Sequence, residues 1–215
     1  MDVMETLERT PVVPLVQADD PAVAVEIARA LVAGGLALVE VVFRTDSALA
    51  CLEAVAAEVP GAAAGAGTVL SAEQARAAAA AGARFVVSPG LDDGVVAAAR
   101  EADLPVFPGV ATATELQRAW NLGLRTVKFF PAAAAGGPVT IKALAAPFRG
   151  MRFMPTGGVS AGNLAEYLAL PAVVACGGSW LTPADAVRGG DYGRITRFAA
   201  DALEIANKAN QARSR

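Results

Sequence analysis

The sequence contains no histidine, and this absence removes the commonest general base and the commonest metal ligand of proteins. Cysteine is almost as scarce: only Cys51 and Cys176 are present, far apart and in apolar surroundings. Two scattered cysteines without histidine cannot form an ordinary zinc site. We expect both to be reduced core residues of a cytoplasmic protein. Any catalysis must therefore rest on Lys, Glu, Asp, Arg, Tyr or the backbone.

Long apolar runs and a charge excess of one sign are also missing. Hydrophobic residues make up 54% of the chain, but no run approaches the roughly 20 apolar residues that span a membrane. The N-terminal MDVMETLERT is acidic, unlike the basic and then apolar start of a secretory signal. Net charge is only -3, and no basic stripe is visible. We expect a soluble protein whose partners are neither nucleic acid nor a membrane.

What the sequence does contain is a repeated unit of one short apolar strand followed by one helix. Asp20 and Pro21 open the first such helix, Ser71 with Gln74 predicts a capping box, and Thr112 with Glu115 predicts another. Ser160 is expected to open a later helix. The predicted strands cover residues 12–16, 37–43, 62–67, 84–87, 105–107, 124–129, 152–154 and 173–176. The final helix is expected over residues 192–209, followed by a polar tail.

Eight strands that alternate with helices favour parallel pairing and closure into a (β/α)8 TIM barrel of the α/β class. We expect a single domain over residues 1–215, with the barrel at about 11–200 and a short N-terminal helix before it. No linker or low-complexity segment divides the chain. A doubly wound open sheet is the alternative architecture.

The clearest chemical signal is Lys128, in the apolar run TVKFFP where a buried strand would end. Burial penalises an unpaired ammonium, so the group either finds a partner or gives up its proton and becomes a nucleophile. Only three of the eighteen basic residues are lysines, and lysine, unlike arginine, can form an imine. The alternative is a lysine that extends from the strand end to a surface carboxylate.

In such a barrel the active site lies at the carboxyl ends of the strands. Glu40 interrupts the strand LALVEVVF, and alternation places it on one face with Leu38 and Val42. If that face is the interior, Glu40 can move protons; the alternative is a structural pair with Lys128. Arg44 follows at the rim, where it can bind a substrate carboxylate or remain a solvated loop arginine.

Two glycine-rich loops, PTGGVS and CGGSW, follow the seventh and eighth strands. Barrels often bind phosphate between these two loops, on backbone N–H groups and a helix N-terminus. Glycine is also common in strand-to-helix turns for purely structural reasons. Together these groups indicate imine chemistry on a phosphorylated 2-oxo acid, making or breaking a carbon–carbon bond next to a ketone.

Seven motifs occur in the same order as in the 2-keto-3-deoxy-6-phosphogluconate (KDPG) aldolase family, which includes the related 4-hydroxy-2-oxoglutarate aldolases. They are EVVFRT, GAGTVL, SPG, FPGVAT, VKFFPA with a following GG, PTGGVS, and GGSWL with a following PAD. The chain resembles this family from about residue 11 to residue 200.

The resemblance implies a class I aldolase without metal or other cofactor, which cleaves the phosphorylated sugar acid to pyruvate and glyceraldehyde 3-phosphate in the Entner–Doudoroff route. It implies Lys128 as the Schiff-base lysine and Glu40 as the general acid/base. It further implies a homotrimer. The remaining roles are Arg44 and Thr68 for the pyruvate carboxylate, Pro89 and Phe130 for its pocket, Thr156 as a substrate contact, and Gly157, Gly158, Gly178 and Ser179 for the phosphate.

The sequence departs from the family at two places. Ala133 and Ala135 stand in the loop PAAAAGG where members often carry Glu and Asn, and Gln17 follows the first strand where many carry a basic residue. These departures leave open the preferred aldehyde and the preference for a phosphorylated substrate. Two other functions also stay open: a metal-dependent pyruvate aldolase, and an inactive barrel that serves as an oligomeric scaffold or sugar-phosphate binder.

Overall fold

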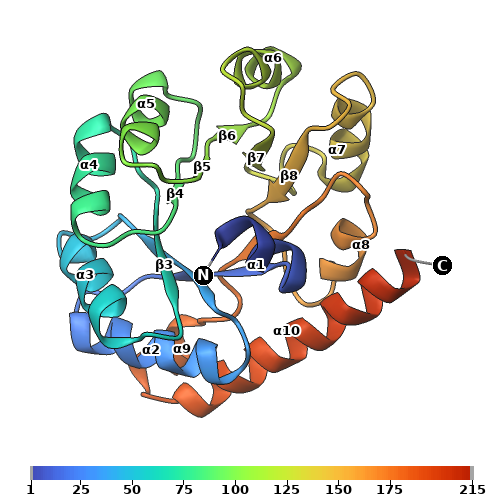
Figure 1. Ribbon diagram of the computed structural model, residues 1–215. Helices are drawn as coiled ribbons and strands as arrows, with labels where there is room; N and C mark the ends of the chain where they lie inside the picture. The colour runs from blue at the N-terminus through green and yellow to red at the C-terminus, as the bar shows by residue number, and fades with distance from the viewer. Residues whose placement is uncertain (1, 214–215) are drawn as a thin grey trace.

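The computed structural model describes residues 2–213, as parallel strands in two hydrogen-bonded groups with helices on their outside (Figure 1). The larger group has the order β5-β4-β3-β2-β1-β9, and the smaller has the order β6-β7-β8. The strands are β1 (Val12–Val16), β2 (Leu38–Val42), β3 (Ala63–Gly67), β4 (Val86–Val87), β5 (Val106–Phe107), β6 (Gly109–Val110), β7 (Thr126–Phe129), β8 (Arg152–Pro155) and β9 (Cys176–Gly178). Parallel strands connected by helices define the α/β class.

The two groups of strands meet on both sides. On one side only Pro108 separates β5, which pairs with β4, from β6, which pairs with β7. Proline has no N–H to donate to a ladder, and this accounts for the break. On the other side single parallel bridges join Phe153 to Val173 and Thr156 to Gly177.

Helices α2 and α6 begin where their capping residues predict them to begin. Asp20 accepts the N–H of Ala22 at the start of α2, and Thr112 forms a full capping box with Glu115 at the start of α6. The helices are α1 (Val3–Arg9), α2 (Pro21–Ala33), α3 (Ala48–Glu58), α4 (Ala72–Ala80), α5 (Asp93–Glu101), α6 (Ala113–Asn121), α7 (Gly137–Ala145), α8 (Leu164–Leu168), α9 (Ala184–Arg188) and α10 (Tyr192–Arg213).

Buried apolar side chains form two clusters, one between strands and helices and one on the other face of the strands. The second cluster joins residues of α1 to inner-face residues of the strands and of the segments just before them: Val3, Leu7, Val13, Leu38, Ala63, Phe85, Val87, Phe107, Met154, Val174 and Ala175. Glu8 of α1 also pairs with Arg152, at 3.2 Å. Helix α1, at the centre of Figure 1, therefore covers the amino end of the strands and leaves the carboxyl end for chemistry.

Strand β3 reads AAGAG and presents only small residues to that inner face. A Cβ atom on Gly65 would lie 2.3 Å from the ring of Phe85, and a Cβ on Gly67 would lie 2.3 Å from Oε1 of Glu40. Both distances are far below van der Waals contact. The small residues of β3 thus leave the space that Phe85 and Glu40 occupy.

Some predicted boundaries were wrong. The last strand is Cys176–Gly178 rather than residues 173–176, because its hydrogen bonds to β1 run through the two glycines. Ser160 does not open α8, which begins after Asn163, whose side chain accepts the Ser160 N–H. Only half of the capping box predicted at Ser71 is present. Ser71 Oγ accepts the Gln74 N–H, but the Gln74 side chain accepts from Leu70 N instead of Ser71 N. Helix α10 continues past 209 to Arg213.

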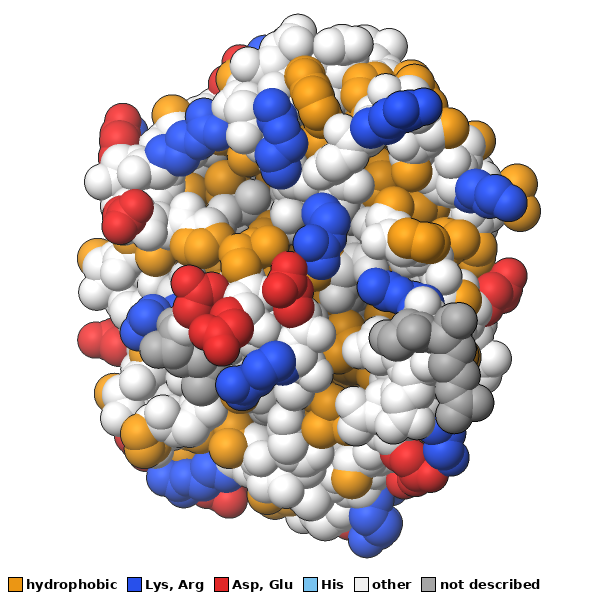
Figure 2. All heavy atoms as spheres, turned by 45° about the vertical axis from the view of Figure 1, so that its right-hand side comes forward, with side chains coloured by type: hydrophobic (Ala, Val, Ile, Leu, Met, Phe, Trp, Pro, Cys, Tyr) orange, Lys and Arg blue, Asp and Glu red, His pale blue; other side chains and the backbone are white. Residues whose placement is uncertain are grey.

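Basic and acidic side chains are interspersed on the face shown in Figure 2. Among the described residues, no helix combines the length and apolar character needed to cross a membrane.

Candidate active site

Lys128 lies on β7 with its side chain directed away from the helices. Its neighbours Val127 and Phe129 belong to the cluster between strands and helices, so alternation turns Lys128 to the inner face. The residue is only 3% exposed. Its Nζ atom lies 3.6 Å from Oε1 of Glu40 and 5.2 Å from the centroid of the Phe130 ring. The alternative in which the lysine extends to the surface is therefore wrong.

Glu40 reaches Lys128 from β2, where Val39 and Val41 face the helices and Leu38 faces inward. The face that Glu40 shares with Leu38 is thus the interior, the condition on which its predicted role depends. The side chain is fully buried, and neither carboxylate oxygen has a hydrogen-bond partner among the described residues. A buried ion pair that serves structure needs good geometry and further hydrogen bonds. This pair has neither, which favours a carboxylate that acts on a bound molecule.

Three other predicted residues directly follow strands at their carboxyl ends. Phe130 is half-buried, with its ring facing the Lys128 amine. Thr156 is buried, and a Cβ on Gly177 would lie 2.4 Å from its Oγ1 atom, so the glycine of β9 makes room for it. Thr68 directly follows β3 with a φ of 59°, a left-handed conformation that is unfavourable for a β-branched residue. Such strain is typical of functional sites.

Arg44 and Ser179 are brought together at the rim. Both are exposed and line one cleft of about 730 Å³ at the carboxyl ends of β1 and β2. Pro89 is half-buried, and its carbonyl oxygen would lie 2.0 Å from a Cβ on Gly109, so the loop after β4 packs on β6.

The glycine-rich loops adopt conformations that need glycine at two positions. Gly157 and Gly158 have φ values of 94° and 79°, in the left-handed region. Gly178 packs against the indole of Trp180. The helices that follow, α8 and α9, have only five residues each, and α8 begins at Leu164. No helix therefore begins directly after PTGGVS, where a helix N-terminus was expected to help bind phosphate. In that loop only the backbone N–H groups are available for this role.

Neither cysteine competes with Lys128 as a nucleophile. Both thiols are free and buried. Burial raises the pKa of Cys176, while burial together with Asp20 and Asp19 raises the pKa of Cys51. A thiol with a raised pKa is a poor nucleophile at neutral pH. The prediction of reduced core residues is consistent with this placement.

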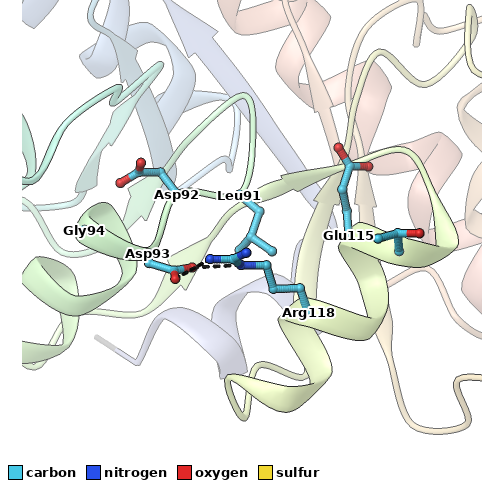
Figure 3. A pocket seen from close by; sticks show the side chains of 7 residues that line it. Leu91, Asp92, Asp93, Gly94, Glu115 and Arg118 are labelled. Atoms are coloured by element: carbon cyan, nitrogen blue, oxygen red, sulfur yellow. Dashed lines mark hydrogen bonds and ion pairs between the residues drawn. The ribbon is translucent and has the colours of Figure 1, made fainter.

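A separate cleft of about 470 Å³ between α5 and α6 has fewer free groups (Figure 3). Figure 3 shows Arg118 directed at Asp93, and the two form an ion pair. Asp92 caps α5 through Val95 N, and Glu115 accepts from Ala111 and Thr112. Each charged side chain of this cleft is already paired, so we do not assign it a ligand. Within residues 2–213, no group of three or more His, Cys, Asp or Glu side chains is placed to hold a metal ion.

The search for polar residues at strand ends missed some residues that line the cleft of Arg44 and Ser179. Thr182 donates from Oγ1 to Leu15 O at 2.7 Å and fixes the segment after β9 to the end of β1. Arg188, the last residue of α9, also lines the cleft. Only the folding back of α9 brings it there, and no local pattern signals this.

An inward lysine beside a buried carboxylate at the carboxyl ends of parallel strands defines a class of enzyme: one that can form an imine with a carbonyl substrate. The sequence matches the model of the KDPG and KHG aldolase family over residues 3–198, and the chain belongs to that family. The predicted resemblance is confirmed.

Curated relatives and a solved structure agree with this assignment. The chain is 47% identical to the 2-dehydro-3-deoxy-phosphogluconate aldolase of Treponema pallidum, over 94% of this chain and 97% of that protein. It is 48% identical to the KHG/KDPG aldolase of Escherichia coli, over 90% and 91%. A KDPG aldolase from Legionella pneumophila, with pyruvate captured as a covalent carbinolamine, superposes with a TM-score of 0.90 at 37% identity, over 94% and 98%.

Proposed function

We propose that the protein is a Schiff-base aldolase that cleaves 2-dehydro-3-deoxy-6-phosphogluconate to pyruvate and glyceraldehyde 3-phosphate. We include 4-hydroxy-2-oxoglutarate, which would give pyruvate and glyoxylate, as a second substrate. The observation that carries the proposal is the Lys128 amine, 3% exposed and 3.6 Å from a carboxylate whose oxygens lack other partners. The names of the relatives and the carbinolamine in the Legionella protein support it.

In this proposal the uncharged Lys128 Nζ attacks the C2 carbonyl carbon of the substrate. The carbinolamine loses water to give an iminium ion. Glu40 then takes the proton of the C4 hydroxyl, the C3–C4 bond breaks, and its electron pair moves toward the iminium nitrogen to form an enamine. The aldehyde leaves, C3 takes back a proton, and water hydrolyses the imine to release pyruvate.

The other site residues have binding roles in this proposal. Arg44 and Thr68 bind the carboxylate next to the ketone, Pro89, Phe130 and Thr156 line the pocket, and Gly157, Gly158, Gly178 and Ser179 bind the phosphate. The shared cleft of Arg44 and Ser179, and the ring of Phe130 beside the amine, support this arrangement.

The architecture that goes with this function is a single domain in which β5 and β6 act as one strand and eight strands close into a (β/α)8 barrel. The pairing of β9 with β1 and the two bridges from β8 support closure. We further propose a homotrimer in the cytoplasm. The exposure of Leu70 (60%) and Val139 (78%) supports association, and two free buried cysteines support a reducing compartment.

The deciding experiment is reduction with borohydride in the presence of pyruvate, followed by peptide mapping. A stable adduct on Lys128 is expected, and it should form equally in the presence of EDTA. No adduct, or an adduct on Lys142 or Lys208, would contradict the proposal. Turnover that EDTA abolishes would instead favour the metal-dependent aldolase.

A further inference from the structure

The cleft at the rim of the site has two walls and a floor. One wall comes from the segment after β1 and the start of α2, and includes Asp19 and Asp20. A second wall comes from Ser179 and helix α9. Its volume of about 730 Å³ lies in the range of small-molecule sites.

The floor of the cleft joins it to the catalytic pair. Leu15 and Val42 line the floor. Leu15 is paired in register with Glu40, and Val42 lies two residues beyond Glu40 on the same inner face of β2. A molecule in contact with Lys128 and Glu40 would therefore extend into this cleft.

The cations of the cleft are two arginines that have no partner of their own. In the part of the chain that the structure describes, the guanidinium groups of Arg44 and Arg188 form no hydrogen bond or ion pair with another residue. The carboxylate on α9 itself, Asp185, pairs instead with Arg194, at 2.7 Å. Asp185, the acidic residue of α9, is thus paired with Arg194, which does not line the cleft. The side chain of Arg188 is left available for a bound molecule.

The acidic residues of the cleft, Asp19 and Asp20, lie together on the other wall. Asp20 is engaged through Oδ1, which accepts the Ala22 N–H at 2.8 Å. Asp19 is exposed on the same wall. A negative group on a bound molecule would be repelled from that wall and attracted to the wall of Ser179 and Arg188.

We propose that Arg188 is a specificity-determining residue, which binds the anionic group at the end of the substrate that leaves as the aldehyde. This inference rests on the proposed function, in which Arg44 binds the carboxylate at the other end. A guanidinium group can donate two parallel hydrogen bonds to a phosphate or a carboxylate. The shared chemistry is therefore a terminal oxyanion, whether phosphate or carboxylate.

The test compares three substrates that share the 2-oxo acid head. KDPG ends in phosphate, 4-hydroxy-2-oxoglutarate ends in carboxylate, and the dephosphorylated sugar acid ends in a neutral hydroxyl. For Arg188→Gln we expect kcat/KM to fall about 10- to 100-fold on whichever anionic substrates use the site, the range of one charged hydrogen-bond contact. The value for the neutral substrate should change less than about twofold. Arg188→Lys, which keeps the charge, should restore part of the loss.

Two controls make each outcome decisive. Arg149→Gln removes an exposed arginine before β8, at the amino end of the strands, and should leave all three substrates unchanged. Borohydride trapping of pyruvate on Lys128 should be the same in Arg188→Gln and the unmodified protein. Equal losses on all three substrates, or no loss on either anionic one, would overturn the role of Arg188. A lack of trapping in the unmodified protein would instead overturn the proposed function.

Discussion

Replacing Gly67 by alanine should slow catalysis without removing any catalytic group. The new Cβ would lie 2.3 Å from Oε1, 2.5 Å from Cγ and 2.7 Å from Cδ of Glu40. Ordinary contact begins near 3.4 Å, so the carboxyl group must move by about 1 Å. A displacement of that size can cost roughly 10²-fold in rate, which corresponds to about 2.7 kcal/mol in the activation barrier.

The matched control is Gly65→Ala, on the same strand and the same face. The three atoms nearest to its Cβ would belong to the ring of Phe85, at 2.3 to 2.5 Å, so the clash falls on that ring and not on Glu40. Each variant should lose about 1 to 3 kcal/mol of stability from overpacking. Only Gly67→Ala should show the loss in kcat, near that of Glu40→Gln, for which we expect about 10²- to 10⁴-fold.

The assay is pyruvate release in steady state, with thermal unfolding and pyruvate trapping measured on the same samples. Trapping reports the Lys128 amine independently of turnover. If Gly67→Ala is folded and traps pyruvate but turns over within about threefold of the unmodified rate, the position of Glu40 does not limit the reaction, and its assignment as acid/base fails.

Three further predictions address the nucleophile, the rim and one helix. Lys128→Arg keeps the charge but cannot form an imine, so turnover and trapping should vanish while the fold persists by circular dichroism; residual turnover would refute the nucleophile. Ser179→Asp places a negative charge on the wall of the cleft, so kcat/KM for the phosphorylated substrate should fall about 10- to 100-fold while pyruvate trapping is unchanged; equal losses on both would contradict phosphate binding there. Partial burial alone would raise the pKa of Glu115, but hydrogen bonds from Ala111 and Thr112 outweigh it and lower that pKa. This stabilisation is therefore present above the unfolded pKa of glutamate and is lost as the pH falls through the lower, folded value. Glu115→Ala should cost about 1 kcal/mol near pH 7 in denaturant unfolding, and the difference should shrink below about pH 4; a difference independent of pH would contradict the mechanism.

Local chemistry predicted much of the fold. The caps at Asp20 and Thr112 depend on side chains a few residues apart, so sequence suffices to find them. Alternation along β2 placed Glu40 on one face with Leu38 and Val42, and only the structure shows that this face is the interior. The polar residues at strand ends then converge because parallel strands share one carboxyl end.

The errors arise where backbone, and not side-chain pattern, decides the structure. Strand β9 is shifted into Gly177 and Gly178, which have no side chain to signal a strand, because β1 pairs with their backbone. The predicted strand over residues 105–107 ends at Phe107, so the short strand β6 beyond Pro108 was missed. Arg188 lines the cleft on a segment that Thr182 fixes to Leu15, and this contact joins residues distant in sequence.

Helix α1 has a consequence for the order of events. Val3 and Leu7 are buried against residues of the inner face, so α1 closes the amino end of the interior in which Lys128 lies. In the proposed mechanism the aldehyde and the hydrolytic water then both pass the carboxyl end. Because pyruvate stays covalently attached to Lys128 until that water arrives, we infer that the aldehyde is released first.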